Sequence, residues 1–201
     1  MARILKFAET FFDEATAVVQ RGGLIAYPTD TVYGLGSDPK NEAAVRRLFE
    51  VKQRAANPIP IMCDSVATAS KLASLSPVAL ELAARYWPGA LTIVAPLKAT
   101  LPFQIHQGTG TLGVRVPGSS LCRELVSRCG GMLTGTSANL SGRKSCTTAE
   151  EVQQSVGPKV DVILDGGTSA NSESTVVRVA GHGIEVLRQG AVRVKEKGVR
   201  P

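Results

Sequence analysis

The sequence predicts an α/β domain built around a mixed β-sheet. Short apolar runs that suit buried strands alternate along most of the chain with segments whose apolar residues recur at helical spacing. Three strand-like runs without a helix between them follow near the C-terminal end, which adds antiparallel pairing. The composition, 43% apolar and 20% charged over 201 residues, suits a single globular core. We therefore expect one domain over residues 1–192 and a short tail over 193–201.

In the first half of the chain, capping residues and glycine or proline pairs set the element boundaries. Thr10 and Asn41 each stand where a side-chain oxygen can accept the first free N–H groups of a helix. Glycines at 22–23 end the first helix, and the Pro-Gly pair at 88–89 punctuates the chain before a strand. In chain order we expect a strand at 3–7, a helix at 11–21, a strand at 24–27, a helix at 42–53, a strand at 59–63, helices at 66–74 and 77–86, and a strand at 91–96.

The second half begins with residues 98–111, which we expect to form a loop. Ser119 is placed to cap a helix over 120–129. Thr147 is placed to cap a helix over 148–155, with Glu150 closing a capping box. The remaining strands are expected at 112–116, 131–135, 160–164, 175–179 and 184–188.

The bulk properties point to a cytoplasmic protein that meets an anion. The 23 basic and 17 acidic residues give a net charge of +6, which suits nucleotide phosphate or nucleic acid, or a plain solvated surface. The four cysteines form no C-x-x-C pair and no zinc spacing, so we expect reduced thiols. The N-terminus lacks the apolar segment of a signal peptide, and the longest apolar run, at 90–97, is too short to span a bilayer.

Several common motifs can be set aside. The GTGTLG stretch at 108–113 precedes a strand, whereas the dinucleotide fingerprint must follow one. Gly130 and Gly135 have the spacing of a phosphate-binding loop, but Thr136 stands where that loop needs its lysine. No G-x-S-x-G is present, and neither histidine is marked as the base of a nucleophile triad. No His/Cys cluster indicates a metal site, and metal ligands stay unknown.

The expected helix at 42–53 directs a lysine inward. Its apolar stripe, continued by seven residues from Val45, reaches Lys52 at the C-terminal end, and Arg54 follows. A buried cation needs a partner, because an unpaired buried charge is costly. An anionic ligand is one partner, and the partial negative charge of the helix C-terminus is the alternative.

The segment 134–146, TGTSANLSGRKSC, is the second candidate site. A strand ends there in a run of small hydroxyl, amide and glycine residues. Gly135 allows close approach of the backbone, while Ser137, Asn139 and Ser145 offer donors and acceptors without bulk. Such a loop can bind an anion, although an ordinary Asx or Ser/Thr turn has the same residues.

Other strand ends carry further polar side chains. The strand at 24–27 breaks at Pro28 into a loop that starts with Thr29. Arg115 alternates with apolar neighbours in its strand and so faces the other side of the sheet, which is either a cleft or solvent. Ser174 lies in the hydroxyl-rich entry ESTVV, and Arg188 ends the last strand.

Together these segments resemble the YrdC-like family of threonylcarbamoyl-AMP synthases. The matching blocks are YPTDTVYGLG, the K-x-R of 52–54 followed by NP, WPGALT, GVRVP, TSANLSG, DGG with ESTVV, and LRQG, in order from residue 24 to 191. The resemblance implies an open twisted mixed sheet with flanking helices and a large concave basic groove. It also implies a nucleotidyltransferase that combines L-threonine, bicarbonate and ATP, releases pyrophosphate, and hands threonylcarbamoyl-AMP to a separate transferase that modifies an adenosine of tRNA.

The resemblance also assigns residues. It implies threonine contacts from Thr29, Arg115, Gly135 and Ser174; ATP contacts from Lys52, Thr111, Ser137, Ser145 and Arg188; and a catalytic set of Lys52, Arg54, Ser137 and Asn139. Magnesium is expected with ATP, although no carboxylate cluster marks its ligands. Because carbamate and triphosphate are both anions, cationic side chains are suited to neutralise them and hold them in line.

Two departures from the family pattern leave alternatives open. Met62 stands near an expected histidine, and the chain stops soon after LRQG, so we expect no additional C-terminal domain. A paralogous enzyme of the same fold, acting on a related adenylate or carbamoyl substrate, is one alternative. A nonenzymatic RNA-binding module is another, although only 4% of the residues are aromatic and base stacking is poorly served. Direct binding of tRNA or double-stranded RNA by the enzyme also stays open.

Overall fold

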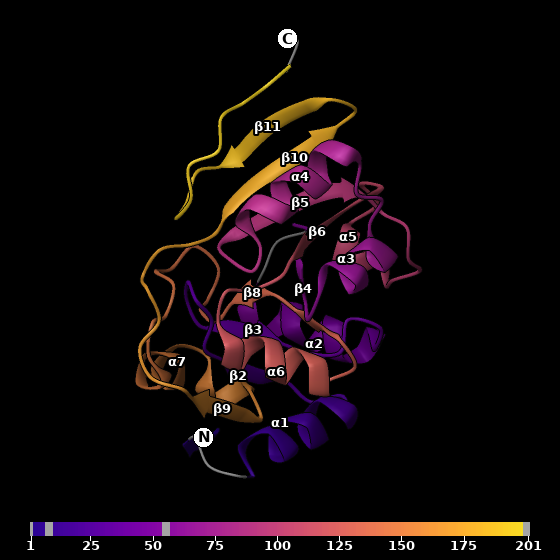
Figure 1. Cartoon of the computed structure of the whole chain (residues 1–201). Coiled ribbons are helices and arrows are strands. Elements are labelled where there is room, and N and C mark those ends of the chain that lie inside the picture. The colour runs from indigo at the N-terminus through magenta and orange to yellow at the C-terminus, as the bar shows by residue number, and fades with distance from the viewer. Residues whose placement is uncertain (1, 7–9, 54–56, 199–201) are drawn as a thin grey trace.

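The computed structural model describes residues 2–6, 10–53 and 57–198 and confirms the mixed α/β class. The strands divide between two mixed sheets, where the sequence suggested one. Figure 1 shows a five-stranded sheet nearer the N-terminus and a six-stranded sheet nearer the C-terminus. The expected single domain over 1–192 and tail over 193–201 stay predictions.

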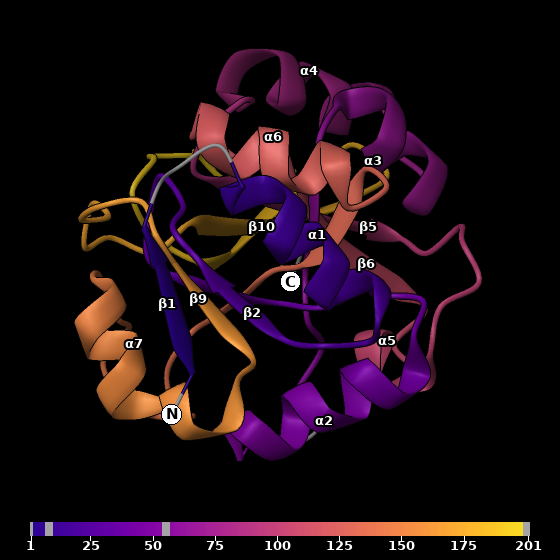
Figure 2. The same cartoon turned by 90° about the horizontal axis from the view of Figure 1, so that it is seen from below.

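The five-stranded sheet follows the order β1-β9-β2-β3-β8. Its strands are β1 (Arg3–Lys6), β9 (Val162–Asp165), β2 (Ile25–Tyr27), β3 (Gly34–Gly36) and β8 (Thr136–Ser137). The first three run parallel, and β3 pairs antiparallel with both β2 and β8. Figure 2 shows β1, β9 and β2 side by side.

Strands β3 and β8 are missing from the sequence prediction because they are very short. β3 is Gly-Leu-Gly, a composition with low strand propensity. The glycines are required by the ring of Tyr27 on the neighbouring strand, since a Cβ on Gly34 would lie 2.9 Å from the ring carbon Cζ and one on Gly36 2.6 Å from Cε1. Tertiary packing against a buried tyrosine therefore decides this strand.

The six-stranded sheet follows the order β11-β10-β5-β6-β4-β7. Its strands are β11 (Gly183–Arg188), β10 (Thr175–Ala180), β5 (Leu91–Pro96), β6 (Thr111–Arg115), β4 (Ile61–Cys63) and β7 (Met132–Thr134). β10 runs parallel to β5 and β4 runs parallel to β6, and the other pairs are antiparallel. All six strands overlap with expected strands.

The helices are α1 (Phe11–Gln20), α2 (Glu42–Lys52), α3 (Val66–Leu72), α4 (Pro77–Tyr86), α5 (Phe103–His106), α6 (Ser120–Arg128) and α7 (Ala149–Ser155), with a 3₁₀ turn at Gly157–Lys159. The caps of Asn41 and Ser119 are confirmed, because each side-chain oxygen accepts a backbone N–H of the first helical turn. The short helix α5 lies within the expected loop at 98–111, so that prediction was wrong in part.

Two capping predictions were wrong in detail. Thr10 makes no side-chain cap bond, and its hydroxyl donates to Glu14 instead. Helix α7 is capped by Thr148, whose Oγ1 accepts from the backbone N–H of Glu151, and the carboxylate of Glu151 accepts from the backbone N–H of Thr147. Both the cap and its acidic partner therefore lie one residue later than expected, because consecutive threonines offer two equivalent caps.

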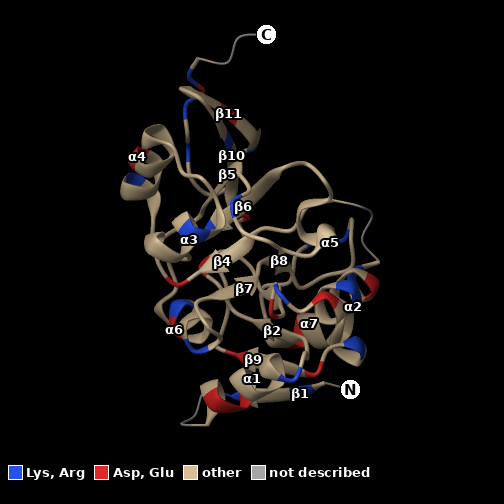
Figure 3. Ribbon diagram, turned by 90° about the vertical axis from the view of Figure 1, so that its right-hand side faces the viewer, with Lys and Arg blue, Asp and Glu red and all other residues tan. Residues whose placement is uncertain are grey.

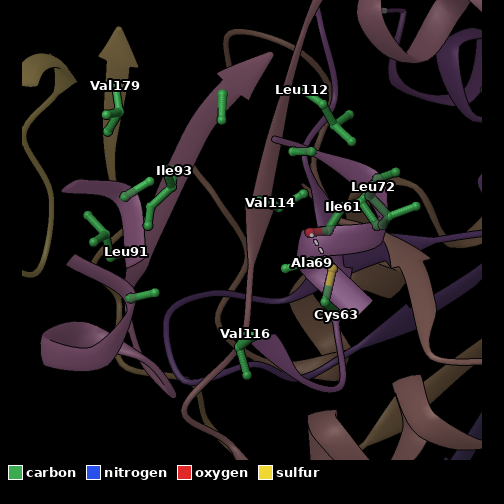
Figure 4. Close-up of a cluster of buried hydrophobic side chains, with 14 of the residues drawn as sticks. Ile61, Cys63, Ala69, Leu72, Leu91, Ile93, Leu112, Val114, Val116 and Val179 are labelled. Carbon is green, nitrogen blue, oxygen red and sulfur yellow. Dashed lines mark hydrogen bonds between the residues drawn. The ribbon is translucent and has the colours of Figure 1, made fainter. Parts of the chain in front are cut away.

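Three apolar clusters form the core and leave part of one sheet face uncovered. One cluster packs α3, α4 and α5 against one face of the six-stranded sheet (Figure 4), through inward residues such as Ile93 and Val114. The five-stranded sheet is covered on both faces, by α1 and α6 through one cluster and by α2 and α7 through another. On its second face the six-stranded sheet is packed by α6 at β4 and β7, through Met62 and Leu133, and its other strands are available to line a cavity.

The two sheets meet at a hydrogen-bonded seam. The hydroxyl of Tyr27 donates to the backbone oxygen of Thr134 at 2.8 Å, and the backbone N–H of Ser37 donates to the Thr134 hydroxyl at 2.9 Å. All three residues are buried, so these bonds are shielded from water. The seam fixes the position of the five-stranded sheet relative to β7.

Candidate small-molecule site between the two sheets

A cavity of about 670 Å³ lies between the two sheets. Its walls come from the loop after β2, from residues 58–62, from β5, β6, β10 and β11, and from residues 135–137. This volume is in the range of small-molecule and cofactor sites. The cavity thus joins segments that are far apart in the sequence, which is typical of a binding site built by the fold.

Strand alternation explains the lining. Residues two apart on a strand share a face. On β10 and the residue before it, Ser174, Val176 and Arg178 line the cavity, while on β6 the lining residues are Thr111, Gly113 and Arg115. The residues between them, such as Val114, pack into the core on the other face. One face of the six-stranded sheet therefore lines the cavity, and the opposite, apolar face packs into the core.

Most predicted site residues reach this cavity. Those that line it are Thr29, Thr111, Arg115, Gly135, Ser137, Ser174 and Arg188. Three others lie next to the lining. The Lys52 side chain donates to the backbone oxygens of the lining residue Ser137 and of Asn139, which follows two residues later. Ser145 hydrogen-bonds to the lining residue Glu173. Arg54 lies outside the described residues. The binding and catalytic roles assigned to all of them stay predictions.

Arg115 is held deep in the cavity by a fixed set of partners. Its side chain is only 2% exposed. Nε donates to the Gly89 oxygen at 2.9 Å, Nη1 to the Thr31 hydroxyl at 3.0 Å, and Nη2 to a carboxylate oxygen of Asp30 at 2.7 Å. These bonds use three of the five N–H donors of a guanidinium and leave one N–H on each Nη outside this set. The face of the sheet that carries Arg115 is therefore a cleft and not solvent.

The loop between β2 and β3 is fixed by its own hydroxyl groups. The Thr29 hydroxyl accepts from the backbone N–H groups of Thr31 and Val32 and donates to the Val32 oxygen at 2.6 Å. Tyr33 closes the loop by donating to the Gly167 oxygen at 2.7 Å. Burial raises the pKa of Tyr33 to about 12. The Thr29 side chain therefore shapes the wall that it lines.

Lys52 is turned inward, as the helical periodicity predicted. Its residue is 1% exposed, and its Nζ donates to the backbone oxygen of Asn139 at 2.8 Å and to that of Ser137. The backbone N–H of Ser141 in turn donates to the Lys52 oxygen at 2.9 Å. The lysine thus ties the end of α2 to the segment 137–141, directly behind the cavity wall. Carbonyl oxygens are among the partners of this buried cation.

Asn139 is buried and shapes the turn that follows β8. Its amide nitrogen donates to the backbone oxygens of Leu140 at 2.9 Å and Arg143 at 2.6 Å. Its side-chain oxygen has no hydrogen-bond partner among the residues that the structure describes. An Asx turn needs the side-chain oxygen to accept a backbone N–H, so this alternative is not met at Asn139 within the described residues. Ser137, two residues earlier, lines the cavity.

The outer wall of the cavity is built around Arg188. Its guanidinium donates to the Ser174 oxygen at 3.1 Å from Nε and 2.9 Å from Nη2, and it forms an ion pair with Glu173. The other oxygen of the Glu173 carboxylate accepts from the Ser145 hydroxyl at 2.7 Å. The Ser174 hydroxyl lies 3.0 Å from that of Thr92. The outer wall thus combines hydroxyl groups with a partly exposed ion pair.

The lining carries three arginines, at 115, 178 and 188, against one acidic residue, Glu173. Figure 3 shows that Lys and Arg elsewhere in the chain are spread over both halves of the molecule and intermixed with Asp and Glu. Sequence reasoning missed Glu173 and Arg178 as site residues. Arg178 could have been found by counting alternate positions from Ser174, whereas Glu173 carried no such signal.

No cluster of three or more His, Cys, Asp or Glu that could hold a metal is present among the described residues. Glu173 is the acidic residue that the described lining offers to a cation entering with a ligand. Within the same described part, no helix is long and apolar enough to cross a membrane.

The fold and the site define an α/β protein with a small-molecule cavity at the junction of two mixed sheets. Residues 17–190 match the Sua5/YciO/YrdC family, described as "Telomere recombination", and the chain belongs to this family.

Curated relatives share the family at moderate identity. Threonylcarbamoyl-AMP synthase of Pyrococcus abyssi is 38% identical over 185 residues, which cover 90% of this chain and 54% of that protein. The protein of the same name from Vibrio vulnificus strain YJ016 is 37% identical over 181 residues, covering 88% of this chain and 97% of that protein. The chain therefore spans about half the length of the first relative and nearly all of the second.

Solved structures share the fold over almost the whole chain. P. abyssi Sua5 complexed with L-threonine superimposes with a TM-score of 0.87 at 35% identity, covering 94% of this chain and 57% of that chain. YciO of E. coli gives a TM-score of 0.90 at 25% identity, covering 97% of this chain and 98% of that one. These likenesses confirm the predicted family and fold class.

Proposed function

We propose that this chain is an enzyme that makes threonylcarbamoyl-AMP from L-threonine, bicarbonate and ATP and releases pyrophosphate. One observation carries the proposal: side chains from separated sequence blocks converge on a single cavity between the sheets, with Arg115 deep in it and Arg188 at its outer wall. The name shared by the curated relatives and the threonine complex of a related structure support the same reaction.

The deep end of the cavity is suited to the amino acid. Arg115 keeps one N–H on each Nη, and a guanidinium binds a carboxylate well through such a pair. Asp30 and Thr31 hold the guanidinium so that it need not reorganise when threonine binds. In this proposal Thr29, Gly135 and Ser174 complete the threonine subsite, Thr29 by shaping the loop and Gly135 by leaving room beside the side chain of Met62.

The outer end is suited to the nucleotide. Thr111, Ser137 and Arg188 of the lining, and Ser145 beside it, are proposed to contact ATP, the hydroxyl groups as donors and the arginine as a charge partner for the phosphates. Lys52 acts in this proposal from behind the wall, by fixing Ser137 and Asn139 through their backbone oxygens. Arg54 completes the proposed catalytic set. Magnesium would enter with ATP, bound by phosphate oxygens and water, and would neutralise charge on the triphosphate.

The reaction has two steps. The threonine amine bonds to the carbon of bicarbonate, and loss of water leaves a carbamate. A carbamate oxygen then bonds to the α-phosphorus while the bond from that phosphorus to the bridging oxygen breaks, so pyrophosphate leaves with the electron pair. Both reactants are anionic, and the protein's part is to neutralise and align them, which preorganised cations do without a protein nucleophile.

The product is a reactive mixed anhydride, which suits hand-over to a second enzyme. We propose that the chain is a nucleotidyltransferase of the cytoplasm whose product a tRNA threonylcarbamoyl transferase consumes in tRNA modification. Direct binding of tRNA or double-stranded RNA remains part of the proposal, because the net charge of +6 favours a phosphate backbone.

Pyrophosphate release tests the reaction. The chain is incubated with Mg·ATP, and each co-substrate, threonine and bicarbonate, is omitted in turn. We expect release to require both. Release that is unaffected by threonine would overturn the proposal.

A paralogous activity is the second candidate, and Met62 favours it. The residue lies in the lining, 5% exposed, near the position where the family pattern led us to expect a histidine. An apolar side chain there suits a substrate with a less polar group than the threonine hydroxyl. Replacing threonine in the same assay by serine, valine and other amino acids distinguishes the two candidates, because a paralogue would turn over faster with one of these.

A further inference from the structure

Glu173 stands out in a cavity proposed to bind anions. It is the one acidic residue of the described lining. One carboxylate oxygen accepts from the Ser145 hydroxyl at 2.7 Å, and the other pairs with Nη1 of Arg188. The carboxylate therefore joins a loop of the five-stranded half to the last strand of the six-stranded sheet.

This arrangement is the one expected for a bound phosphate. A phosphate oxygen would accept from a hydroxyl and from a guanidinium, as the carboxylate oxygens of Glu173 do. Ser145 and Arg188 are both proposed to contact ATP. The Ser145 hydroxyl has a single proton, which it donates to Glu173, so a phosphate that accepts from this hydroxyl must take the place of the Glu173 carboxylate.

Arg188 does not depend on Glu173 for its position. It also donates from Nε and Nη2 to the Ser174 oxygen and from Nη2 to the Ser174 hydroxyl, at 3.1, 2.9 and 3.2 Å. The Glu173 backbone is likewise fixed, because its oxygen accepts from the N–H of Ala191 at 2.9 Å. The Glu173 side chain, 40% exposed, can swing toward solvent while the backbone and the arginine stay in place.

We propose that Glu173 is a built-in competitor of the nucleotide phosphates. It occupies Ser145 and Arg188 before ATP binds, moves outward when ATP binds, and returns when pyrophosphate leaves. It thereby weakens the affinity for ATP and pyrophosphate and leaves the affinity for threonine unchanged. This inference rests on the proposed function, since it concerns the nucleotide end of the same site.

The size of the effect follows from the exposure of the pair. Arg188 is 47% and Glu173 40% exposed, and such partly solvated ion pairs are weak. The apparent dissociation constant equals the intrinsic one divided by the fraction of molecules in which Glu173 does not occupy the site. We therefore expect removal of the carboxylate to tighten ATP binding about threefold to tenfold, with the larger value if the phosphate charge is also repelled by Glu173.

The test uses Glu173→Gln and Glu173→Ala, with Glu185→Ala as a matched control. Glu185 pairs with Arg178, which also lines the cavity, and the exposures of that pair, 42% and 48%, nearly equal those of the first. Calorimetry measures the affinities for ATP and for threonine separately. Each ATP titration is made with Mg²⁺ and with a chelator, and thermal melts verify that the variants fold.

We expect both Glu173 variants to bind ATP more tightly under both conditions, threonine binding to stay unchanged, and Glu185→Ala to change ATP affinity less than about twofold. Unchanged or weaker ATP binding in the Glu173 variants would overturn the inference, and a loss seen only with Mg²⁺ would identify Glu173 as a metal ligand instead. A wild-type chain that binds no ATP would overturn the proposed function itself, so the two failures are distinguishable.

Discussion

The cavity has two arginines that sit in contrasting surroundings. Arg115 is 2% exposed and makes three hydrogen bonds, to Gly89, Thr31 and Asp30. Arg188 is 47% exposed and forms an ion pair with the carboxylate of Glu173, which is itself partly exposed. The first lies in the middle of the sheet on β6, and the second ends the edge strand β11.

The difference indicates two kinds of recognition. A buried guanidinium with fixed partners presents its remaining N–H groups in one geometry, which favours a single small carboxylate. A partly exposed arginine at a strand end is screened by water and can adapt, which favours a longer anion with several charged oxygens. One cavity therefore offers a rigid subsite and an adaptable one, and variants of each should differ in both binding and stability.

The largest effect is expected for Arg115→Ala. Removing one partner of a buried charge pair costs about 2–5 kcal/mol, and each 1.4 kcal/mol is a factor of ten, so threonine affinity should fall about 30-fold or more. Because Asp30 loses its partner, the melting temperature should fall as well. ATP affinity should change less than about threefold. Calorimetry with each ligand and a thermal melt measure these quantities.

Arg178→Ala is the control for this variant, because it removes an arginine from the same lining at a 48% exposed position. Arg115→Lys keeps the charge and loses the paired geometry, and it should recover stability more than threonine affinity. Equal loss of both ligands in Arg115→Ala would refute the division of the cavity into two subsites.

The next largest effect is expected for Lys52→Met. Methionine has a similar length and is apolar, so the backbone oxygens of Ser137 and Asn139 lose a buried donor. Leaving buried acceptors unsatisfied costs about 1–3 kcal/mol, and the loosened wall should lower pyrophosphate release about 10- to 100-fold. Turnover and melting temperature are measured against Arg46→Met, an exposed position on the same helix. Wild-type turnover in Lys52→Met would contradict a positioning role for the lysine.

Arg188→Ala should have a moderate effect confined to the nucleotide. Partly exposed ion pairs contribute about 0–1 kcal/mol, so the melting temperature should stay close to that of the wild type. ATP affinity should fall about tenfold, because one charged hydrogen bond to phosphate is lost. Calorimetry with ATP and threonine checks the split. A stability loss as large as that of Arg115→Ala would remove the contrast between the two arginines.

The sequence predicts side-chain direction well where a periodic element carries the residue. Helical spacing turned Lys52 inward, and strand alternation placed Arg115 on the face opposite Val114. Neither pattern shows which face meets a ligand, because that depends on how the two sheets meet. The pairing of Glu173 with Arg188 and Ser145 was not predictable, since it joins residues that only the tertiary fold brings together. The short strand Gly34–Gly36 was missed because packing against Tyr27 specifies it.

The smallest effect is expected for Thr29→Val, which tests whether Thr29 contacts the amino acid or shapes the loop. Valine keeps the shape but cannot accept from the N–H groups of Thr31 and Val32. The loss of these loop bonds should cost about 1 kcal/mol of stability and lower threonine affinity about threefold to tenfold, since Thr31 helps to hold Arg115. Thr29→Ser keeps the hydroxyl and should behave like the wild type. If Thr29→Val lowers threonine affinity as far as Arg115→Ala does while leaving the melting temperature unchanged, then the Thr29 hydroxyl contacts the amino acid directly and does not act by shaping the loop.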